Sequence, residues 1–202
     1  MAISRAASVT ASRAGRGFTA AELLVTVSIL AILAAVATPS LTAAMRRTVI
    51  ASAANEVHTA VIRARLEAQR AGQAGTPFTV CASSTSATPA TAVCAGAWTS
   101  GLIVFADANG NGSRELSEPV VYSLPAMNSN VSVSVRTAVS FVLYTPGGLL
   151  NGSHTGMRMS FTHARLPVQA DVQHLCVMRS GVEVVRDAAL QSESRLAACR
   201  AL

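Results

Sequence analysis

The chain has 202 residues, half of them apolar, which is enough for one membrane helix and one modest globular domain and excludes a second large core. All 16 basic residues are arginine, against 10 acidic residues, and three of the arginines precede residue 18, so the remaining chain has a net charge of only +3. The isoelectric point of about 10.1 therefore overstates the case for nucleic acid, and anionic lipid, DNA and an acidic protein all stay open as partners.

The N-terminal 17 residues are polar and basic, and they precede a stretch from Leu23 to Met45 that contains no charged side chain. A secretory signal peptide has the opposite arrangement, because its apolar region precedes the cleavage site and is removed. Here the only plausible cut follows Gly17 and would leave the apolar segment on the mature chain. The arginines before the span also follow the positive-inside bias, which predicts a cytoplasmic leader and a head on the other side of the membrane.

The segment Gly17-Phe18-Thr19-Ala20-Ala21-Glu22 resembles the class III leader of type IV pilins and pseudopilins, in which a prepilin peptidase cuts after the glycine and methylates the new N-terminal phenylalanine. By this resemblance Gly17 precedes the cut, Phe18 becomes the N-methylated terminus, Glu22 is the fifth mature residue and Pro39 the twenty-second. A chance Gly-Phe before a generic membrane helix would not explain the single carboxylate at the edge of the span.

The resemblance implies a single-pass protein of the inner membrane with its head in the periplasm. Its expected partners are the prepilin peptidase, other pilins or pseudopilins in a filament, and the inner-membrane assembly platform. A carboxylate inside a bilayer costs about 2.5 to 3.5 kcal/mol at mid-helix on insertion scales, so Glu22 should have a partner. The resemblance supplies one, the free amine on Phe18 of a neighbouring subunit, and Glu22 is therefore expected to act in assembly.

From Phe18 to about Ala71 the sequence predicts one long helix, interrupted only by Pro39, which lacks a backbone donor and favours a kink. Its second half is amphipathic, and Gly72 is expected to help end it. The apolar stripe consists of Ile50, Ala53, Val57, Val61, Ala64 and Ala68. The chain thus divides into a cleaved leader (1–17), a hydrophobic transmembrane and assembly helix (18–41), an amphipathic helix (42–72) and a β-rich periplasmic head (73–202).

After Gly75 the pattern changes to short β-rich runs separated by turn residues, which predicts a mostly antiparallel head and an α+β, pilin-like fold. The strict alternation from Val131 to Val135 predicts a half-buried strand. The expected strands are Phe78 to Cys81, Leu102 to Phe105, Val120 to Leu124, Val131 to Val135, Val139 to Tyr144, Met157 to Phe161, His174 to Met178 and Val182 to Val185.

Four cysteines form an even set in a head that the leader would send to an oxidising compartment, so disulfides are expected. The sequence permits three connectivities. We favour Cys81 with Cys94 and Cys176 with Cys199, because each pair closes a short polar or terminal segment. Zinc is disfavoured, since no Cys-x-x-Cys occurs and the histidines show no ligand spacing.

The run from Trp98 to Asp107, continuing into Asn109-Gly110-Asn111-Gly112, is similar to the tryptophan, strand and Asp-Asn-Gly turn of the GspH/FimT group of minor pilins and pseudopilins. The resemblance covers nearly the whole chain, least of all the segment between Val131 and Met157. It implies a structural subunit of a type II secretion pseudopilus or a type IV pilus, acting in filament assembly and protein secretion. The sequence does not distinguish the two systems.

The same turn fits a calcium loop, with Asp107, Asn109 and Asn111 at positions one, three and five, Gly112 at six and Glu118 at twelve. Against calcium, a strand rather than a helix precedes the loop, and Asn and Gly also form a tight hairpin turn without an ion. Calcium is the one cofactor that the sequence suggests.

DNA uptake is the alternative function, because some FimT-like minor pilins that the chain resembles take part in it through a C-terminal Gly-Arg-x-Arg segment. Here that place reads Gly181-Val182-Glu183-Val184-Val185-Arg186, which lacks the first arginine and adds a glutamate that repels phosphate. The residues left to form a basic edge are Arg179, Arg186, Arg195 and Arg200.

Hydrolase chemistry is a third class, for which Ser153, His154, His163 and Asp171 are suitable residue types. No nucleophile elbow or metal motif surrounds them, so we expect no enzymatic activity.

Overall fold

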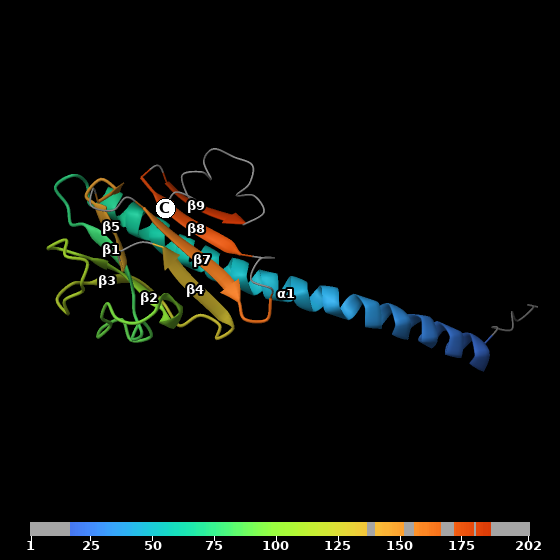
Figure 1. Ribbon diagram of the computed structural model, residues 1–202. Helices are drawn as coiled ribbons and strands as arrows, with labels where there is room; N and C mark the ends of the chain where they lie inside the picture. Colours follow the sequence, from blue (N-terminus) through green and yellow to red (C-terminus); the bar gives the residue numbers. More distant parts are fainter. Residues whose placement is uncertain (1–16, 137–139, 152–155, 167–171, 180, 187–202) are drawn as a thin grey trace, which may run out of the picture. The chain divides into compact units, whose positions relative to one another are not determined.

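The computed structural model describes residues 17–136, 140–151, 156–166, 172–179 and 181–186. The chain falls into two compact units, residues 1–42 and residues 43–202. One long helix, α1, contributes to both units, and all the described strands belong to the second (Figure 1).

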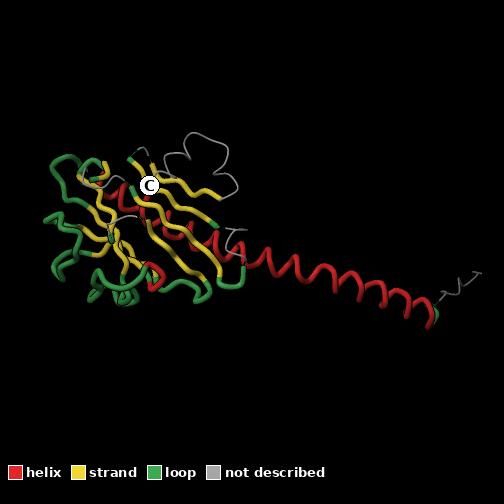
Figure 2. The backbone as a smooth tube through the Cα atoms, in the orientation of Figure 1, coloured by secondary structure: helices red, strands yellow, loops and turns green. Residues whose placement is uncertain are grey.

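The helix α1 runs from Ala20 to Arg70 and continues through Pro39 (Figure 2). The predicted long helix is confirmed, and Pro39 does not break it, whereas the kink expected there stays a prediction. A proline removes one backbone hydrogen bond and leaves those of the neighbouring turns. Close to it, the hydroxyls of Thr38 and Ser40 donate to backbone carbonyl oxygens of the preceding turn at 2.6 and 2.8 Å.

The helix ends where the sequence predicts. Gly72 has a φ of 70°, in the left-handed region that favours glycine, and its amide donates to the Gln69 carbonyl at 3.1 Å. Such a residue satisfies one of the last carbonyls of a helix and turns the chain away from the helix axis.

The nine strands of the described residues form two antiparallel sheets, one in the order β3-β2-β1-β5-β6 and one in the order β4-β7-β8-β9 (Figure 1). The strands are β1 (Phe78–Ala82), β2 (Leu102–Ala106), β3 (Val120–Leu124), β4 (Val131–Arg136), β5 (Phe141–Thr145), β6 (Leu149–Leu150), β7 (Met157–His163), β8 (Gln173–Met178) and β9 (Gly181–Arg186).

All eight predicted strands are present, and the α+β fold is confirmed. The strand expected from Val139 begins at Phe141, with residues 137–139 outside the described part of the chain. Two elements were missed, the two-residue strand β6 and a short 3-10 helix at Trp98–Ser100, because neither is long enough to produce a periodic pattern.

The main core lies between the second half of α1 and the sheets. All six residues of the predicted apolar stripe are buried, together with Ala54 and Ala60. Five of these eight side chains are alanine, and such small residues let the helix backbone lie close to the sheet residues that pack against it. Those residues include Val80, Val104 and Met159.

The central strands of the first sheet are buried on both faces. All five residues of β1 are buried, because a second small cluster of Cys81, Ala92, Ile103 and Phe105 covers the face that the main core does not. This explains why β1 and β2 show continuous apolar runs in the sequence. In contrast, β4 alternates from the buried Val131 onward, which confirms its predicted half-buried pattern.

Candidate functional site: the apolar helix and the head loops

The first half of α1 exposes a continuous apolar surface. Its most apolar stretch of 18 residues has a mean hydropathy of 2.4 and no buried residue. Leu24, Leu30 and Ile32 illustrate this with exposed fractions of 69%, 64% and 65%. Within the described residues α1 is the one helix long and apolar enough to cross a membrane. Exposed apolar area of this extent indicates a membrane or protein partner.

The helix begins with a capping box formed by Thr19 and Glu22. The amide of Glu22 donates to Thr19 Oγ1 at 3.2 Å, while the amide and hydroxyl of Thr19 donate to Glu22 Oε2 at 2.9 and 3.0 Å. The Thr19 carbonyl accepts the first helical hydrogen bond, from Leu23, at 3.1 Å. Thr-x-x-Glu is a known capping signature, so the sequence contained this feature although it was not predicted.

The predicted processing site lies just outside the helix. Gly17, Phe18 and Thr19 are not helical, and the Phe18 side chain is 84% exposed. The peptide bond between Gly17 and Phe18 is therefore free of the helical hydrogen-bond ladder. Pro39, the other predicted assembly residue, lies exposed within α1.

In the head, the fully buried carboxylate of Asp107 organises the loop that follows β2. Its Oδ2 accepts hydrogen bonds from the Thr79 hydroxyl at 2.7 Å and the Gly112 amide at 2.9 Å, and its Oδ1 accepts one from the Asn111 amide at 3.1 Å. The loop is thereby attached to β1, which carries Thr79.

Two glutamates complete this loop. Glu118 is buried, and its two oxygens accept from the backbone amides of Ala108 at 2.8 Å and Glu115 at 2.9 Å. The exposed carboxylate of Glu115 accepts from the side-chain amides of Asn109 at 2.9 and 3.0 Å and of Asn111 at 3.1 Å. These amides, that of Asn109 first, hold the pKa of Glu115 below its usual value.

The structure brings the four predicted calcium ligands into one loop, but their oxygens accept N–H hydrogen bonds. This holds for Asp107 and Glu118, and also for the Oδ1 atoms of Asn109 and Asn111, which accept from backbone amides at 3.0 and 2.7 Å. No cluster of three His, Cys, Asp or Glu residues suited to a metal occurs in the part of the chain that the structure describes. Calcium binding at this loop stays a prediction, and it would require these hydrogen bonds to be replaced.

Arg114 joins the Asp107 loop to the disulfide loop. Its buried guanidinium donates to the carbonyl of Glu118 at 3.0 Å, to that of Ala92 and, at 3.5 Å, to that of Ala90. Sequence reasoning did not find these contacts, because no local pattern indicates which carbonyls a long side chain reaches.

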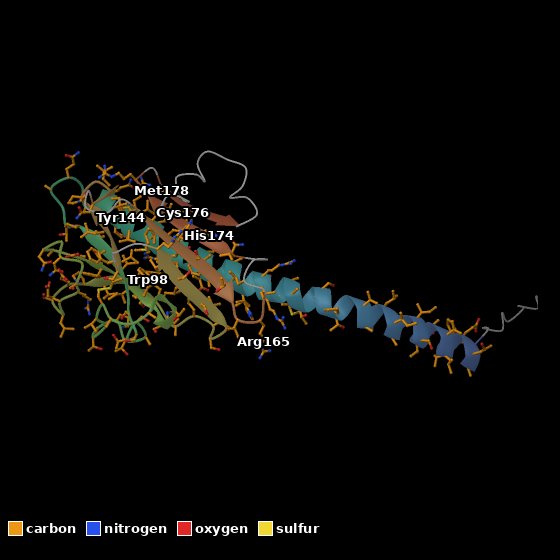
Figure 3. The ribbon with its side chains drawn as sticks, viewed as in Figure 1. Trp98, Tyr144, Arg165, His174, Cys176 and Met178 are labelled. Carbon is orange, nitrogen blue, oxygen red and sulfur yellow. A yellow bond between two sulfur atoms is a disulfide. The ribbon has the colours of Figure 1, made fainter. Side chains whose placement is uncertain are left out.

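The predicted bond between Cys81 and Cys94 is present, with the two Cα atoms 5.6 Å apart. Cys176 lies on β8 (Figure 3). It is fully buried and is not a free thiol. Cys199, its predicted partner, lies outside the described residues, so this second pairing stays a prediction.

Half of the basic edge considered for DNA lies within the described residues. Arg179 is exposed just after β8, and Arg186 is the last residue of β9. Arg195 and Arg200 lie outside the described residues.

Of the residues suited to hydrolysis, only His163 lies within the described part of the chain. His163 is buried at the end of β7, where its Nδ1 accepts a hydrogen bond from the Arg165 amide at 3.1 Å. Ser153, His154 and Asp171 lie outside the described residues.

Comparison with known proteins relates the chain to one family. The model of a family described as type II transport protein GspH matches residues 53–181, more than half of the chain. No curated protein sequence matches. Two crystal structures of the type IV minor pilin FimU of Pseudomonas aeruginosa, strain PAO1, are similar to the chain at 15% identity. The P21 form gives a TM-score of 0.51 over 73% of this chain and 95% of FimU, and the P65 form gives 0.47 over 71% and 96%.

Proposed function

The chain belongs to the GspH family of minor pilins and pseudopilins, and we propose that it is a filament subunit whose N-terminal helix packs among other pilin helices, with its head at the filament's periphery or tip. Members of this family are structural subunits and not enzymes. The finer proposal is that the subunit acts in filament assembly and protein secretion, in a type II secretion pseudopilus or a type IV pilus.

The exposed apolar half of α1 carries this proposal. A folded soluble protein would bury residues such as Leu24, Leu30 and Ile32, whereas here they are more than half exposed. In the membrane they would contact lipid, and in a filament they would contact neighbouring helices. Because lipid tails are as apolar as leucine, the hydrophobic effect does not drive this exchange, and it depends on close packing and polar contacts between helices.

The second half of α1 supports the same division of work. Its apolar stripe is buried in the core of the head. The face of the helix that carries this stripe is therefore not available for contacts with other subunits of the filament. The helix thus joins two surfaces of different use, one for the filament and one for the fold of the subunit itself.

Processing is the first test of the proposal. Mass spectrometry of the protein from its native host should find a chain that begins at N-methylated Phe18. An intact start methionine, or a cut beyond Met45 that frees a soluble head, would contradict the proposal.

Assembly is the second test. We expect Glu22→Ala to be cleaved and inserted like the wild type but to be depleted from sheared filaments, because the carboxylate is proposed to bind the N-terminal amine of a neighbour. Glu56→Ala is the matched control, since Glu56 is an exposed acid on the same helix outside the apolar half. Equal incorporation of both variants would argue against a role for Glu22.

The choice between a secretion pseudopilus and a pilus depends on the partner genes, and the presence of secretin and secretion-type pseudopilin genes nearby would favour the pseudopilus.

DNA binding remains the alternative. It predicts that the protein retards duplex DNA at low salt and releases it as salt rises, and no retardation at low ionic strength would dismiss it.

A further inference from the structure

The uncharged stretch of α1 ends at two consecutive arginines, Arg46 and Arg47. As a helix, the stretch from Leu23 to Met45 is about 35 Å long, and the hydrocarbon core of a bilayer is about 30 Å thick. A helix that crosses the membrane through this stretch therefore places Arg46 among the lipid headgroups on the side of the head. The positive-inside bias disfavours arginines on that side, so their presence there calls for a stabilising partner.

The fold adds a third arginine at this place. Arg165 lies in the turn after β7, 119 positions further along the chain than Arg46, and its carbonyl oxygen accepts a hydrogen bond from Arg46 Nη1 at 3.0 Å. Figure 3 shows Arg165 beside α1. Arg46 and Arg165 are called the arginine pair below.

Arg165 is presented by a turn whose backbone is well held. The Ala164 amide donates to the Asn130 carbonyl at 2.9 Å. The amides of Arg165 and Leu166 donate to Nδ1 and to the carbonyl of His163, at 3.1 and 3.0 Å respectively. Leu166 also packs against the main core, whereas Arg165 is exposed. The turn thus fixes the backbone on both sides of Arg165 and leaves its side chain accessible to a ligand.

The arginine pair has no acidic partner among the described residues. Arg46 donates to a neutral carbonyl, and no described residue accepts a hydrogen bond from the Arg165 guanidinium or forms an ion pair with either arginine. Two positive charges held together repel each other, and an anion bound by both would offset this repulsion. A phosphate diester fits this place, because a planar guanidinium can donate two parallel hydrogen bonds to phosphate oxygens.

We propose that Arg46 and Arg165 form a binding site for the headgroup phosphate of an anionic phospholipid, which holds this end of the head on the membrane surface before the subunit enters a filament. The inference rests on the membrane-anchored stage of the proposed function and not on the filament. A lipid is favoured over an acidic protein because Arg46 directly follows the exposed apolar stretch of the same helix.

The experiment titrates the full chain in a nonionic detergent with phosphatidylglycerol or phosphatidylcholine and measures bound lipid by native mass spectrometry. An anionic lipid surface attracts one basic residue by about 1 kcal/mol, which corresponds to about a fivefold change in affinity. Two arginines should therefore give about a 25-fold preference for phosphatidylglycerol. Arg46→Gln and Arg165→Gln should each reduce this preference about fivefold and leave the affinity for phosphatidylcholine unchanged.

Three controls make the result specific. Arg70→Gln should keep the wild-type preference, because Arg70 is an exposed arginine of the same helix that pairs with Glu67 at 3.0 Å. Arg165→Lys keeps the positive charge and should keep most of the preference, and equal midpoints of urea unfolding show that each variant is folded. Glycerol phosphate, a soluble phosphate ester without acyl chains, should not displace phosphatidylglycerol at equal concentration.

The inference is overturned if the wild-type chain binds both lipids equally, or if Arg46→Gln and Arg165→Gln keep the wild-type preference. Displacement by an equal concentration of glycerol phosphate would also overturn it, because the site would then recognise a free phosphate. Depletion of the two variants from filaments with an unchanged lipid preference would show that the arginine pair binds an acidic protein surface. A wild-type chain that stays in solution without detergent and binds neither lipid would instead contradict the membrane anchor of the proposed function.

Discussion

The loop around Asp107 offers the sharpest test of what holds the head together. Asp107 is fully buried and accepts three hydrogen bonds, from the Thr79 hydroxyl and the amides of Asn111 and Gly112. Replacement by alanine leaves all three donors without their acceptor. Hydrogen bonds to a charged group contribute about 1.5 to 3 kcal/mol each. Of the three donors only the Asn111 amide belongs to an exposed residue and can regain water, since Gly112 and Thr79 are buried. We therefore expect Asp107→Ala to destabilise the protein by about 3 to 5 kcal/mol, much of the stability of a typical domain.

A graded series makes this prediction quantitative. In Asp107→Asn the remaining carbonyl can occupy the Oδ2 position and keep the bonds to Thr79 and Gly112, while the amide group faces the Asn111 donor. This change should cost about 1 to 2 kcal/mol. Asn109→Ala is the control from the same loop, because Asn109 is exposed and accepts a single backbone bond, and it should cost less than about 1 kcal/mol.

The assay is equilibrium urea unfolding of the full chain in detergent, with either a calcium chelator or roughly millimolar calcium present. The hydrogen-bond account predicts the same ranking of variants in both solutions. It is refuted if Asp107→Ala and Asn109→Ala are equally stable. If calcium raises the wild-type midpoint and leaves that of Asp107→Ala unchanged, the loop binds calcium and the hydrogen bonds seen here describe its ion-free form.

Three further predictions concern the head. In urea unfolding, Gly112→Ala should destabilise the protein by about 2 to 4 kcal/mol and Gly110→Ala by about 1 kcal/mol. Both glycines have a positive φ, but only at Gly112 would the new Cβ lie closer than 3.0 Å to Phe141, so equal costs would contradict this account. Burial raises the pKa of Tyr144 to about 12, so its contribution to stability is present below about pH 10 and is lost as pH rises toward 12. Tyr144→Phe should therefore reduce the loss of stability at alkaline pH, and an unchanged profile of stability against pH would refute this prediction. The lowered pKa of Glu115 means that its contribution is lost as pH falls below about 4.5, and Glu115→Gln should flatten the acid limb of the same profile.

The exposed and buried halves of α1 also predict where substitutions are tolerated. Val57 and Val61 are fully buried against the sheets, so changes there act on the fold of the head. Leu24 and Leu30 are exposed, so changes there act on the membrane and filament contacts of the subunit. A stability measurement and an incorporation measurement on the same variants distinguish these two effects.

Local patterns in the sequence were sufficient for the anchor, the amphipathic stripe and the strands. A helix repeats every 3.6 residues and a strand every two, so the spacing of apolar residues is enough to identify both, as Ile50 to Ala68 and Val131 to Val135 illustrate. The Cys81–Cys94 disulfide was also accessible in this way, because the two cysteines enclose one short loop. These features depend on neighbours that are close in the chain.

Tertiary structure alone decided which partners the polar groups of the head would have. Thr79 and Asp107 are 28 positions apart and meet because β1 and β2 are paired, and Arg114 reaches Ala92 from 22 positions away. No local spacing in the sequence indicates such long-range contacts. The same Asp-Asn-Gly sequence is therefore compatible with a bound cation or with a ring of amide donors. The sequence determined which segments form and which face of each is apolar, whereas the fold determined which buried acceptors were satisfied, because that depends on distant donors brought within hydrogen-bonding distance.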